Sequence, residues 1–488
     1  MLSTAHHADV IIVGAGLAGL SAAHRLTSAG VSVSVLEAAP SPGGRMSTEV
    51  SDGFRLDRAG GLLSTSYPEL LRAPCLGEAE LRLFAPGVLV HSGGRLHRTG
   101  EARGTRGAFT AARALRSAAR APLSGGASNG GPLSGFGGAG LGGAGLTSAG
   151  LPGTGLTGAG LRAGGLTGGA LVSGAFMSSA LDRARLGAAL ARLAATPVER
   201  LLARPEQTAL AALRSYGLPP RAAAAFLRPL LAALLSDPGL TTSSRCADLA
   251  LRGFARGRLC VPAGGASVLP ERLAATLPPG TVTTGVTVTA ASISTVSTAE
   301  LSTLGCRALI VATDARSAAR LLPGLRVPAF HPVTVLHHSA PVTPRTGRSL
   351  VLDADRSGPV SHSVVMSEVD PARAPDGRAL ISSTVLGAPW SGLERAARSQ
   401  LAALHGTPTD DWELLAVHHS PDAVPAMPPP HDVRRPVRLL AGLYVCGDHR
   451  DTSTAQGALV SGRRAAQAVM RDFGIKPDAA VDGFPLAA

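Results

Sequence analysis

Short runs of branched apolar residues, glycine turns and small-residue helical stretches follow one another at the start of this chain. The run Val10–Val13 predicts a buried parallel strand, because all of its side chains are apolar rather than alternating with polar ones. A small-residue stretch after it predicts a helix, and Val31–Leu36 predicts a second strand. The pattern therefore opens with a strand, a helix and a strand in close succession.

The same reading finds further elements along the chain. Residues 268–321 are rich in strand signals, which include the Val/Thr-dense stretch Thr281–Thr289 and the apolar run Ala308–Ala312. Ser179–Leu235 predicts helices broken at prolines, with an end at Asp237-Pro238-Gly239. A last strand over Leu439–Val445, a turn and a small-residue helix over Thr454–Met470 complete the pattern.

One segment follows neither the helical nor the strand period. Between Phe136 and Leu181 a large apolar residue recurs every fifth position within a Gly/Leu-rich tract, and no charged residue occurs from Ala121 to Leu161. The spacing is similar to pentapeptide repeats, whereas the glycine content raises the entropy cost of ordering. We expect a poorly ordered insertion over 124–175, with a short β-helical or glycine-packed ornament, or a self-association segment, as alternatives.

The composition excludes some classes of partner. The formal net charge is +13, from 46 basic and 33 acidic residues, but Lys476 is the only lysine and aromatic residues make up 3% of the chain. A base-stacking surface is therefore not expected, and we predict no nucleic-acid partner. The densest basic stretch favours a solvated face, with a peripheral membrane contact as the alternative; it comprises Arg95, Arg98, Arg103, Arg106, Arg113, Arg116 and Arg120.

Cysteine usage and the apolar runs favour a cytoplasmic protein. The five cysteines are scattered and show neither CxxC nor zinc-ligand spacing, which is typical of buried thiols in a reducing compartment. Only nine residues precede the first strand, so no secretory signal is expected, and no apolar run is long enough to predict a transmembrane helix.

The turn after the first strand carries the most specific chemistry. Gly14, Gly16 and Gly19 form a GxGxxG motif between a strand and a helix, in which the first glycine permits the turn and the second admits a pyrophosphate. The third allows close packing of helix and strand. Glu37 ends the second strand, where an adenosine ribose needs a hydroxyl acceptor, and its charge disfavours the 2′-phosphate of NADP.

Three further pieces accompany this dinucleotide motif. Gly43-Gly44-Arg45 follows the second strand, and Gly53–Gly61 forms another glycine-containing loop that ends in Gly60-Gly61. Far along the chain, Leu443–Cys446 leads into the turn Gly447-Asp448 and then the helix that begins near Gln456-Gly457-Ala458.

In these residues the chain resembles the flavin amine oxidase superfamily, which also contains protoporphyrinogen oxidases and phytoene desaturases. The resemblance covers 1–72, 258–325 and 436–474 well and the middle of the chain less well. It implies an α/β protein with a discontinuous Rossmann-type FAD-binding domain in those three parts and a 475–488 tail. An interleaved α+β substrate domain would then occupy 73–257, with the insertion, and 326–435.

The resemblance also implies which residues hold FAD. Glu37 would bind the adenosine ribose, the turn would bind the pyrophosphate, and Arg45 and Asp448 would lie along the ribityl side. Val288 would meet the adenine through its backbone, and the Gln456–Ala458 helix start would point at the isoalloxazine. The implied cofactor residues are Gly14, Gly16, Leu17, Ala18, Gly19, Glu37, Gly43, Gly44, Arg45, Gly60, Gly61, Val288, Thr313, Gly447, Asp448, Gln456, Gly457 and Ala458.

One departure from the family pattern bears on the substrate. Amine oxidases of the family keep a lysine near the flavin, but Lys476 lies past the closing helix, and few aromatic residues are available to cage an amine. We therefore expect a desaturase-like or oxidase-like enzyme that removes hydride from a hydrophobic small molecule. Oxidation of an amine or amino acid is the first alternative, and a flavin-binding scaffold that works through its five-residue repeat is the second.

No catalytic residue stands out. His449 follows Gly447-Asp448 and is the single weak candidate, with a turn or capping role as the alternative. The adjacent pairs His337-His338 and His418-His419 would point to opposite faces of strands, so we predict no metal site. The substrate, the electron acceptor and the oligomeric state are not readable from the residues.

Overall fold

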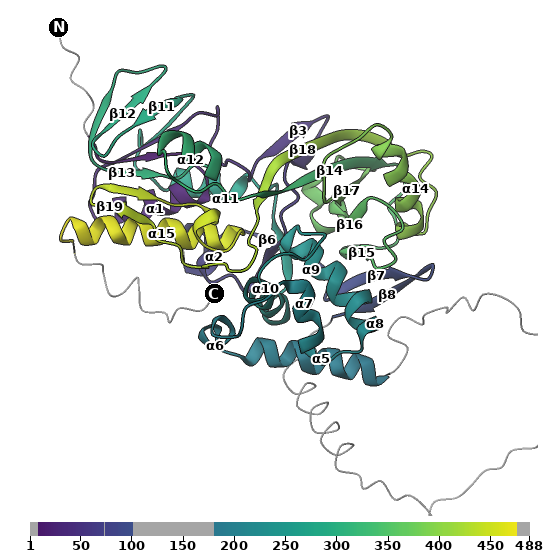
Figure 1. The fold of residues 1–488 in the computed structure, drawn as a ribbon. Coiled ribbons are helices and arrows are strands. Elements are labelled where there is room, and N and C mark those ends of the chain that lie inside the picture. The colour runs from purple at the N-terminus through teal and green to yellow at the C-terminus, as the bar shows by residue number, and fades with distance from the viewer. Residues whose placement is uncertain (1–7, 73, 101–179, 476–488) are drawn as a thin grey trace, which may run out of the picture. The chain divides into compact units, whose positions relative to one another are not determined.

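The structure is a computed structural model that describes residues 8–72, 74–100 and 180–475. The five-residue repeat, the predicted insertion 124–175, Lys476 and most of the basic stretch lie outside the described residues. Figure 1 shows the arrangement of the helices and strands.

A mainly parallel sheet carries the amino-terminal motif. Parallel pairing joins β10 (Val282–Thr284), β2 (Val33–Glu37), β1 (Ala8–Val13), β13 (Leu304–Val311) and β20 (Leu443–Val445), in that order. The antiparallel strands β12 (Thr295–Thr298), β11 (Val288–Ala291) and β19 (Arg438–Leu440) extend it. Strands from three distant stretches of sequence thus form one sheet, and their carboxyl ends meet at one edge.

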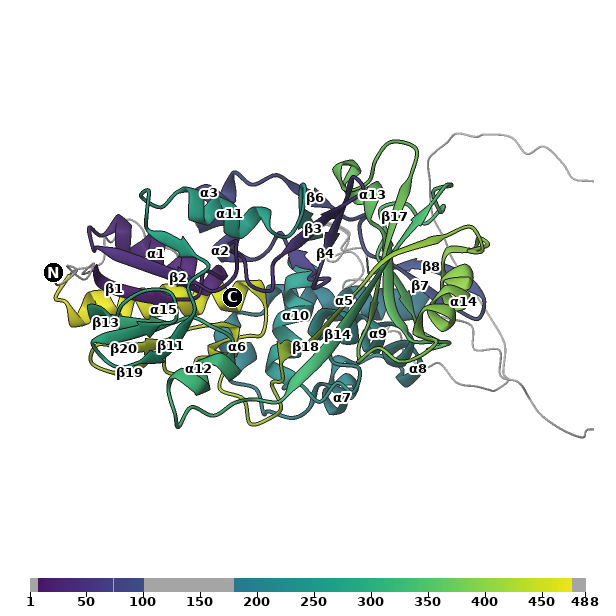
Figure 2. The same cartoon turned by 90° about the horizontal axis from the view of Figure 1, so that it is seen from above.

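Two helices pack together beside this sheet. The helix α1 (Leu17–Ser28) lies against α15 (Ala455–Asp472), which both Figures 1 and 2 show. A Cβ on Gly462 of α15 would overlap the backbone oxygen of Ala18 in α1, so the glycine permits this close approach. The helices α11 (Val268–Ala275) and α12 (Ala315–Leu321) complete the set, and the buried core includes Val10, Ile12, Leu20 and Tyr444.

A second sheet contains seven strands. Its order is β18 (Glu413–Pro425), β14 (Phe330–Ala340), β17 (Ala379–Val385), β16 (Val360–Val365), β15 (Val351–Asp353), β7 (Val88–Ser92) and β8 (Arg95–Thr99). The long antiparallel strands β14 and β18 lie side by side in Figure 2. The helix α14 (Leu393–His405) packs on this sheet through Leu393, Ala397 and Leu401.

A group of helices packs against the second sheet. It comprises α5 (Ala180–Ala195), α6 (Val198–Leu202), α7 (Ala209–Ala212), η1 (Leu213–Tyr216), α8 (Pro220–Ala222), the π-helical turn η2 (Ala223–Leu227), α9 (Arg228–Leu235) and α10 (Ser244–Arg256). These helices share one apolar cluster with Leu350, Leu352 and Leu380 of the sheet region.

Two small sheets and several short helices complete the described fold. One sheet pairs β3 (Thr48–Ser51) with β4 (Phe54–Asp57), and the other contains β5 (Leu63–Ser64), β9 (Leu259–Pro262) and β6 (Leu81–Leu83). The short helices are α2 (Pro68–Arg72), α3 (Pro74–Gly77), α13 (Met366–Val369), η3 (Pro371–Arg373) and η4 (Asp448–Arg450).

The predicted elements differ from the structure at both ends of the strand-rich segment 268–321, which are the helices α11 and α12, and at two turns. Thr281–Thr289 is not one strand, because Gly285, with φ of 72°, turns the chain between β10 and β11. Leu439–Val445 is likewise the hairpin of β19 and β20, which turns at Gly442 with φ of 84°. In both places a glycine in the left-handed region interrupts a run of residues that favour strands.

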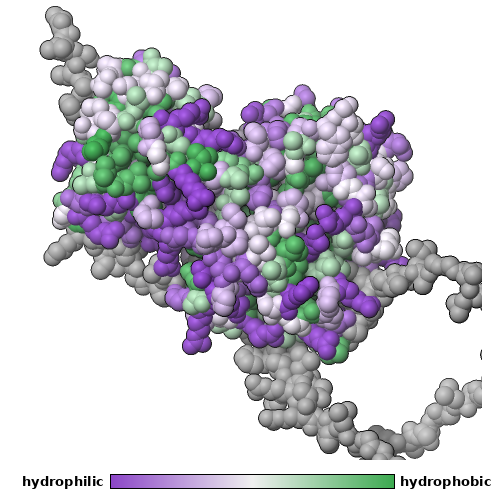
Figure 3. Space-filling view, viewed as in Figure 1, coloured by the Kyte–Doolittle hydropathy of each residue, from purple (hydrophilic) through white to green (hydrophobic). Residues whose placement is uncertain are grey.

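The surface and the thiols bear on the remaining expectations. No helix in the described stretches is both long and apolar enough to span a bilayer. On the face shown in Figure 3, hydrophilic residues predominate and hydrophobic areas are interspersed among them. Cys246, Cys260, Cys306 and Cys446 are free thiols, and burial raises the pKa of Cys246, Cys260 and Cys446 to about 12.

Candidate functional site

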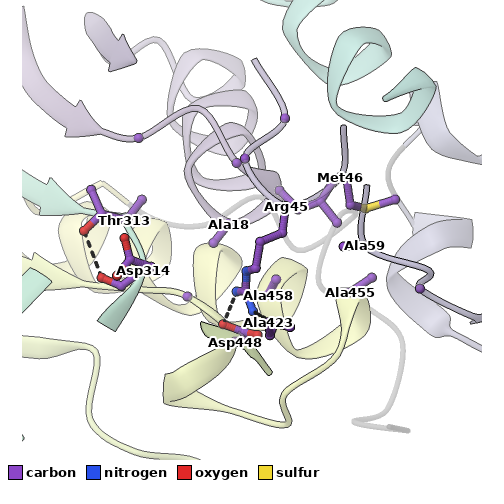
Figure 4. A pocket seen from close by; sticks show the side chains of 18 of the residues that line it. Ala18, Arg45, Met46, Ala59, Thr313, Asp314, Ala423, Asp448, Ala455 and Ala458 are labelled. Carbon is purple, nitrogen blue, oxygen red and sulfur yellow. Dashed lines mark hydrogen bonds and ion pairs between the residues drawn. The ribbon is translucent and has the colours of Figure 1, made fainter. Parts of the chain in front are cut away.

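A cavity of about 850 Å³ lies at the carboxyl edge of the parallel sheet. Its walls come from both sheets and from the turns that precede α1 and α15 (Figure 4). This volume is within the range of sites that bind a small molecule or a cofactor. Of the predicted cofactor residues, those on this wall are Gly14, Gly16, Leu17, Ala18, Glu37, Gly43, Gly44, Arg45, Gly60, Gly61, Val288, Thr313, Gly447, Asp448 and Ala458.

The glycine turn presents bare backbone to the cavity. Gly14 has φ of 105°, and its amide donates to the carbonyl of Leu36, which fixes the turn on the neighbouring strand. Gly43 donates to the carbonyl of Ala15 at 2.9 Å, so the second glycine segment is tied to the first. A Cβ on Gly16 would meet nothing within 4 Å, and one on Gly44 would meet only Gly16 Cα at 3.8 Å. These two glycines therefore leave open space beside the amino-terminal end of α1.

Glu37 is held in place by the same turn. Its carboxylate accepts hydrogen bonds from the amides of Ala15 at 2.7 Å and Ala39 at 2.9 Å. The carboxylate thereby sits at the end of β2 and on the cavity wall, next to the strand end that carries the glycines. An anionic oxygen in this position is suited to accept a hydrogen bond from a ribose hydroxyl.

Arg45 and Asp448 bring the two distant halves of the wall together. Arg45 Nη2 lies 2.6 Å from Asp448 Oδ1, and Arg45 Nη1 donates to the carbonyl of Ala423 at 2.7 Å (Figure 4). Burial opposes the charge on Arg45, but Asp448 and Asp314 outweigh it and raise the pKa of the guanidinium. The arginine is therefore a fixed cation beside the cavity rather than a group that titrates.

The helix α15 begins at the cavity wall. Thr454 caps it, because the threonine hydroxyl oxygen accepts from the amide of Gly457 at 3.1 Å. Ala455 and Ala458 of the first turn lie on the wall, and their small side chains leave the helix end accessible. The partial positive charge of a helix amino terminus would favour negative charge there, by roughly 0.3–1 kcal/mol.

Four predicted site residues lie behind the wall instead of on it. A Cβ on Gly19 would overlap the oxygen of Gly14, and one on Gly457 would overlap the oxygen of Thr452, so both glycines serve close packing. Gln456 Oε1 accepts from the amide of Glu69 at 3.0 Å and ties α15 to α2. His449 packs over Gly447, and burial lowers its pKa to about 4.

The wall beside the seven-stranded sheet consists of residues that no motif identified. Tyr67, Leu234, Val333, Thr384 and Val424 come from five separate segments. Burial raises the pKa of the Tyr67 hydroxyl to about 12, so this side chain is neutral at ordinary pH. These residues form one wall only because the fold brings their segments together, since none of them belongs to a local sequence pattern.

One group of possible metal ligands occurs among the described residues, and it lies away from the cavity. It comprises His91, Asp353 and Asp355. Both carboxylates already accept backbone hydrogen bonds, from Arg356 to Asp353 and from Gly93 to Asp355. We assign no metal to these residues.

The residues on the wall fit a flavin dinucleotide. The open space in front of Gly16 and Gly44 provides a cradle that any side chain would fill, beside amides suited to a pyrophosphate. The Glu37 carboxylate on the wall would suit a ribose hydroxyl, and the cavity extends to a region lined by apolar side chains. Fold and site together define a dinucleotide-binding protein.

Comparison with known proteins gives the family. Residues 17–470 match the profile of the family described as flavin containing amine oxidoreductase, and the chain belongs to this family of FAD-dependent enzymes. Putrescine oxidase from Kocuria rosea is 47% identical over 68 residues, which are 14% of this chain and 14% of that protein. The chain therefore matches about one seventh of the length of this curated relative.

Solved structures share the fold over nearly the whole chain. A proposed protoporphyrinogen oxidase from Exiguobacterium sp. 255-15 superposes with a TM-score of 0.61 at 16% identity, covering 97% of this chain and 100% of that chain. Cyclohexylamine oxidase from Brevibacterium oxydans IH-35A gives 0.60 at 16% identity, covering 96% and 99%. At this identity the likeness shows the mixed α/β fold and not the substrate.

Proposed function

We propose that this protein is an FAD-dependent oxidoreductase that removes hydride from a neutral, hydrophobic small molecule. The single observation that carries the substrate class is the wall beside the seven-stranded sheet, where Leu234, Val333 and Val424 supply apolar surface and Leu62 of the neighbouring loop extends it. Such a wall favours an apolar substrate held in a water-poor site.

The positions of the aromatic residues support the same choice. Tyr67 is the one aromatic residue that the structure places on the cavity wall. Trp390 is exposed, Trp412 lies in the core beside α14, and Tyr216 donates to Asp248 at 2.8 Å. An aromatic pair that could cage an amine is thus not found on the described part of the wall.

The cofactor residues named from the sequence are part of the proposal. Glu37, the Gly14–Ala18 turn and Gly43-Gly44 would hold the ADP half of FAD, and Arg45 with Asp448 would hold the middle. We further propose that 1–72, 258–325 and 436–474 form the FAD-binding domain, and that 73–257 and 326–435 form the substrate domain.

The chemistry that FAD supplies when bound is acceptance of a hydride at N5. The chain would contribute position and electrostatics. The apolar wall would orient the substrate and exclude water. The amino terminus of α15 and the Arg45 cation would stabilise the negative charge that the cofactor gains with the hydride.

Amine oxidation is the second candidate, and a specific observation favours it. Putrescine oxidase shares 47% identity with the chain over 68 residues, and the family carries the amine oxidoreductase description. The two candidates differ in the charge of the substrate. A diamine brings two ammonium groups at neutral pH, whereas the described wall consists largely of apolar side chains.

Anaerobic mixing of the purified holoprotein with two sets of compounds tests the proposal. We expect neutral hydrophobic compounds with an abstractable hydride to bleach the flavin absorption, and putrescine and cyclohexylamine to leave it unchanged. Rapid bleaching by an amine, with none by the neutral set, would replace the proposal with the amine oxidase. Unchanged turnover after deletion of 124–175 would count against the scaffold alternative.

A further inference from the structure

A second, smaller cavity of about 30 Å³ adjoins the large one. The two share Gly60, Gly61, Leu62 and Thr384 as a common wall. A Cβ on Gly60 would lie 3.0 Å from Thr384 Oγ1 and 3.3 Å from Val335 Cγ2, so the loop backbone passes directly over the sheet here. The small cavity has room for about two water molecules or for one small substituent of a ligand.

The floor of the small cavity is one face of the seven-stranded sheet. In one row across the strands, His362 pairs with Thr384 and Thr384 pairs with Val335. In the next row on the same face, Val364 pairs with Ser382 and Ser382 pairs with His337. Since alternate residues of a strand share a face, these six side chains form a continuous patch, and all six line the cavity.

The polar groups of the second row already have partners. His337 Nε2 lies 3.1 Å from the carbonyl oxygen of Asp57, so this nitrogen carries the proton and donates. His337 Nδ1 must then accept, and it does so from the Ser382 hydroxyl at 3.0 Å. Both nitrogens of His337 are therefore used, and the lone pairs of Ser382 remain as acceptors.

His362 differs from His337. Its residue exposure is 4%, it lines the small cavity, and its buried Nδ1 has no hydrogen-bond partner among the described residues. A buried polar ring without a protein partner is costly, so a ligand or a water in the cavity that bonds to the His362 imidazole is favoured. Burial also lowers the pKa of His362 to about 4, which keeps the ring neutral.

The charged groups of the small cavity balance each other. Arg373 lies 2.9 Å from Asp57 and 3.0 Å from Asp370, and Asp370 also lies 3.6 Å from Arg82. Of these four groups only Arg373 and Asp57 line the cavity, and they pair with each other, so the lining carries no unpaired charge to attract an ion. A ligand group that enters this cavity has to be neutral and able to form a hydrogen bond.

We infer that the small cavity binds a hydroxyl or carbonyl group of the substrate, and that His362 is the residue that recognises it. The inference rests on the proposed function, because it assigns one end of the substrate to this cavity and the reacting carbon to the large one. It narrows the substrate class to hydrophobic molecules that carry a neutral oxygen substituent.

Four ligands that share one ring and differ in one substituent test this inference on the holoprotein. They are cyclohexanol, cyclohexylamine, cyclohexanecarboxylate and methylcyclohexane, with binding measured by flavin absorbance and by calorimetry. We expect cyclohexanol to bind tightest at neutral pH. The His362→Leu variant should lose about fivefold in affinity for cyclohexanol alone, the value of one ordinary hydrogen bond, and His362→Asn should recover part of it.

His338 supplies the matched control. It is the neighbour of His337 in β14, is fully buried, and has a pKa lowered by burial to about 4, but it faces Trp412 and Glu394 on the other side of the sheet. His338→Leu should leave all four affinities unchanged. Flavin content and thermal unfolding of each variant report whether it has folded.

The outcomes separate the two proposals. Tightest binding of the ammonium or carboxylate ligand, equal binding of all four, no binding of any, or an equal loss in both histidine variants would overturn the subsite. A protein that holds no flavin would overturn the proposed function, and calorimetry with the same ligands would still decide the subsite.

Discussion

At the scale of single residues, Gly16 and Gly19 belong to one motif but do different work. The space in front of Gly16 is open, whereas a Cβ on Gly19 would overlap the oxygen of Gly14. Gly16 has an extended backbone, with φ of −77°, that any residue adopts. Gly16 therefore leaves space for a ligand, whereas Gly19 leaves space for the close packing of α1 on the glycine turn.

We predict that Gly16→Val weakens flavin retention without unfolding the protein. Valine would occupy the space proposed for the pyrophosphate, and overpacking of about 1–3 kcal/mol weakens binding by roughly 5- to 150-fold. The flavin-to-protein ratio after gel filtration measures the loss, and thermal unfolding of the apoprotein should stay unchanged. Gly19→Val should instead lower the unfolding temperature, and full flavin occupancy in Gly16→Val would contradict the assignment.

Local chemistry explains why part of this site could be predicted. The strand, the glycine spacing and Glu37 lie within 28 consecutive residues, 10–37, and each imposes its geometry locally. Thr384, Leu234 and Val424 carry no such signal, because strand alternation tells which residues share a face but not which cavity that face meets. Gln456 shows a third case, since its place in the closing turn suggested cofactor contact while its side chain ties α15 to α2.

At the scale of elements, the replacement of two helical glycines by alanine should change the stability of the protein in opposite directions. Gly462→Ala should destabilise the protein by about 1–3 kcal/mol, because its Cβ would overlap Ala18 where α15 crosses α1. Gly187→Ala in α5 should stabilise it by about 0.5–1 kcal/mol, since this glycine is exposed and a Cβ there meets nothing within 4 Å. Urea unfolding of both variants measures the difference. A stability gain in Gly462→Ala would show that the two helices are not packed as described.

The histidines of β14 and β16 make stability depend on pH. Burial lowers the pKa of His337, His338 and His362 to about 4, as it does for His405 and His449. An unfolded histidine titrates near 6.5, so the unfolded chain binds more protons than the folded one between pH 6.5 and 4. The free energy of unfolding should therefore fall as the pH drops through this window, by on the order of 1 kcal/mol per pH unit for each histidine.

Urea unfolding at several pH values between 7.5 and 4.5 checks this prediction. Burial raises the pKa of Asp451 to about 6 and also raises the pKa of Asp248, which acts in the opposite direction, but these are two groups against the five histidines. His338→Leu should reduce the slope of unfolding free energy against pH by the equivalent of about one proton. A slope that is flat or of opposite sign in the parent protein would refute the assignment of neutral buried histidines.

Elements defined by one uninterrupted pattern were predictable, and those set by a single turn were not. The strand β1 and the helix α15 follow from apolar runs and small-residue periodicity. The hairpin of β19 and β20 escaped prediction, because Gly442 sits inside an apolar run and only its positive φ marks the turn. The order of the strands in the two sheets could not be predicted from the sequence, since strand order is decided by contacts between distant segments.

At the scale of the whole molecule, the described chain brings two sheets to one cavity. The cradle in front of Gly16 and Gly44 lies at the end of the parallel sheet, and the seven-stranded sheet contributes Val333, Thr384 and Val424. Family membership makes this an FAD-dependent enzyme, and the division of the wall into a polar cradle and an apolar face is what supports hydride removal from a neutral substrate.

The visible absorption spectrum of the purified protein tests this account most directly. We predict flavin absorption bands corresponding to about one FAD per chain, restored to the apoprotein by added FAD and bleached anaerobically by a neutral hydrophobic substrate. A colourless protein that also fails to take up added FAD would contradict the account.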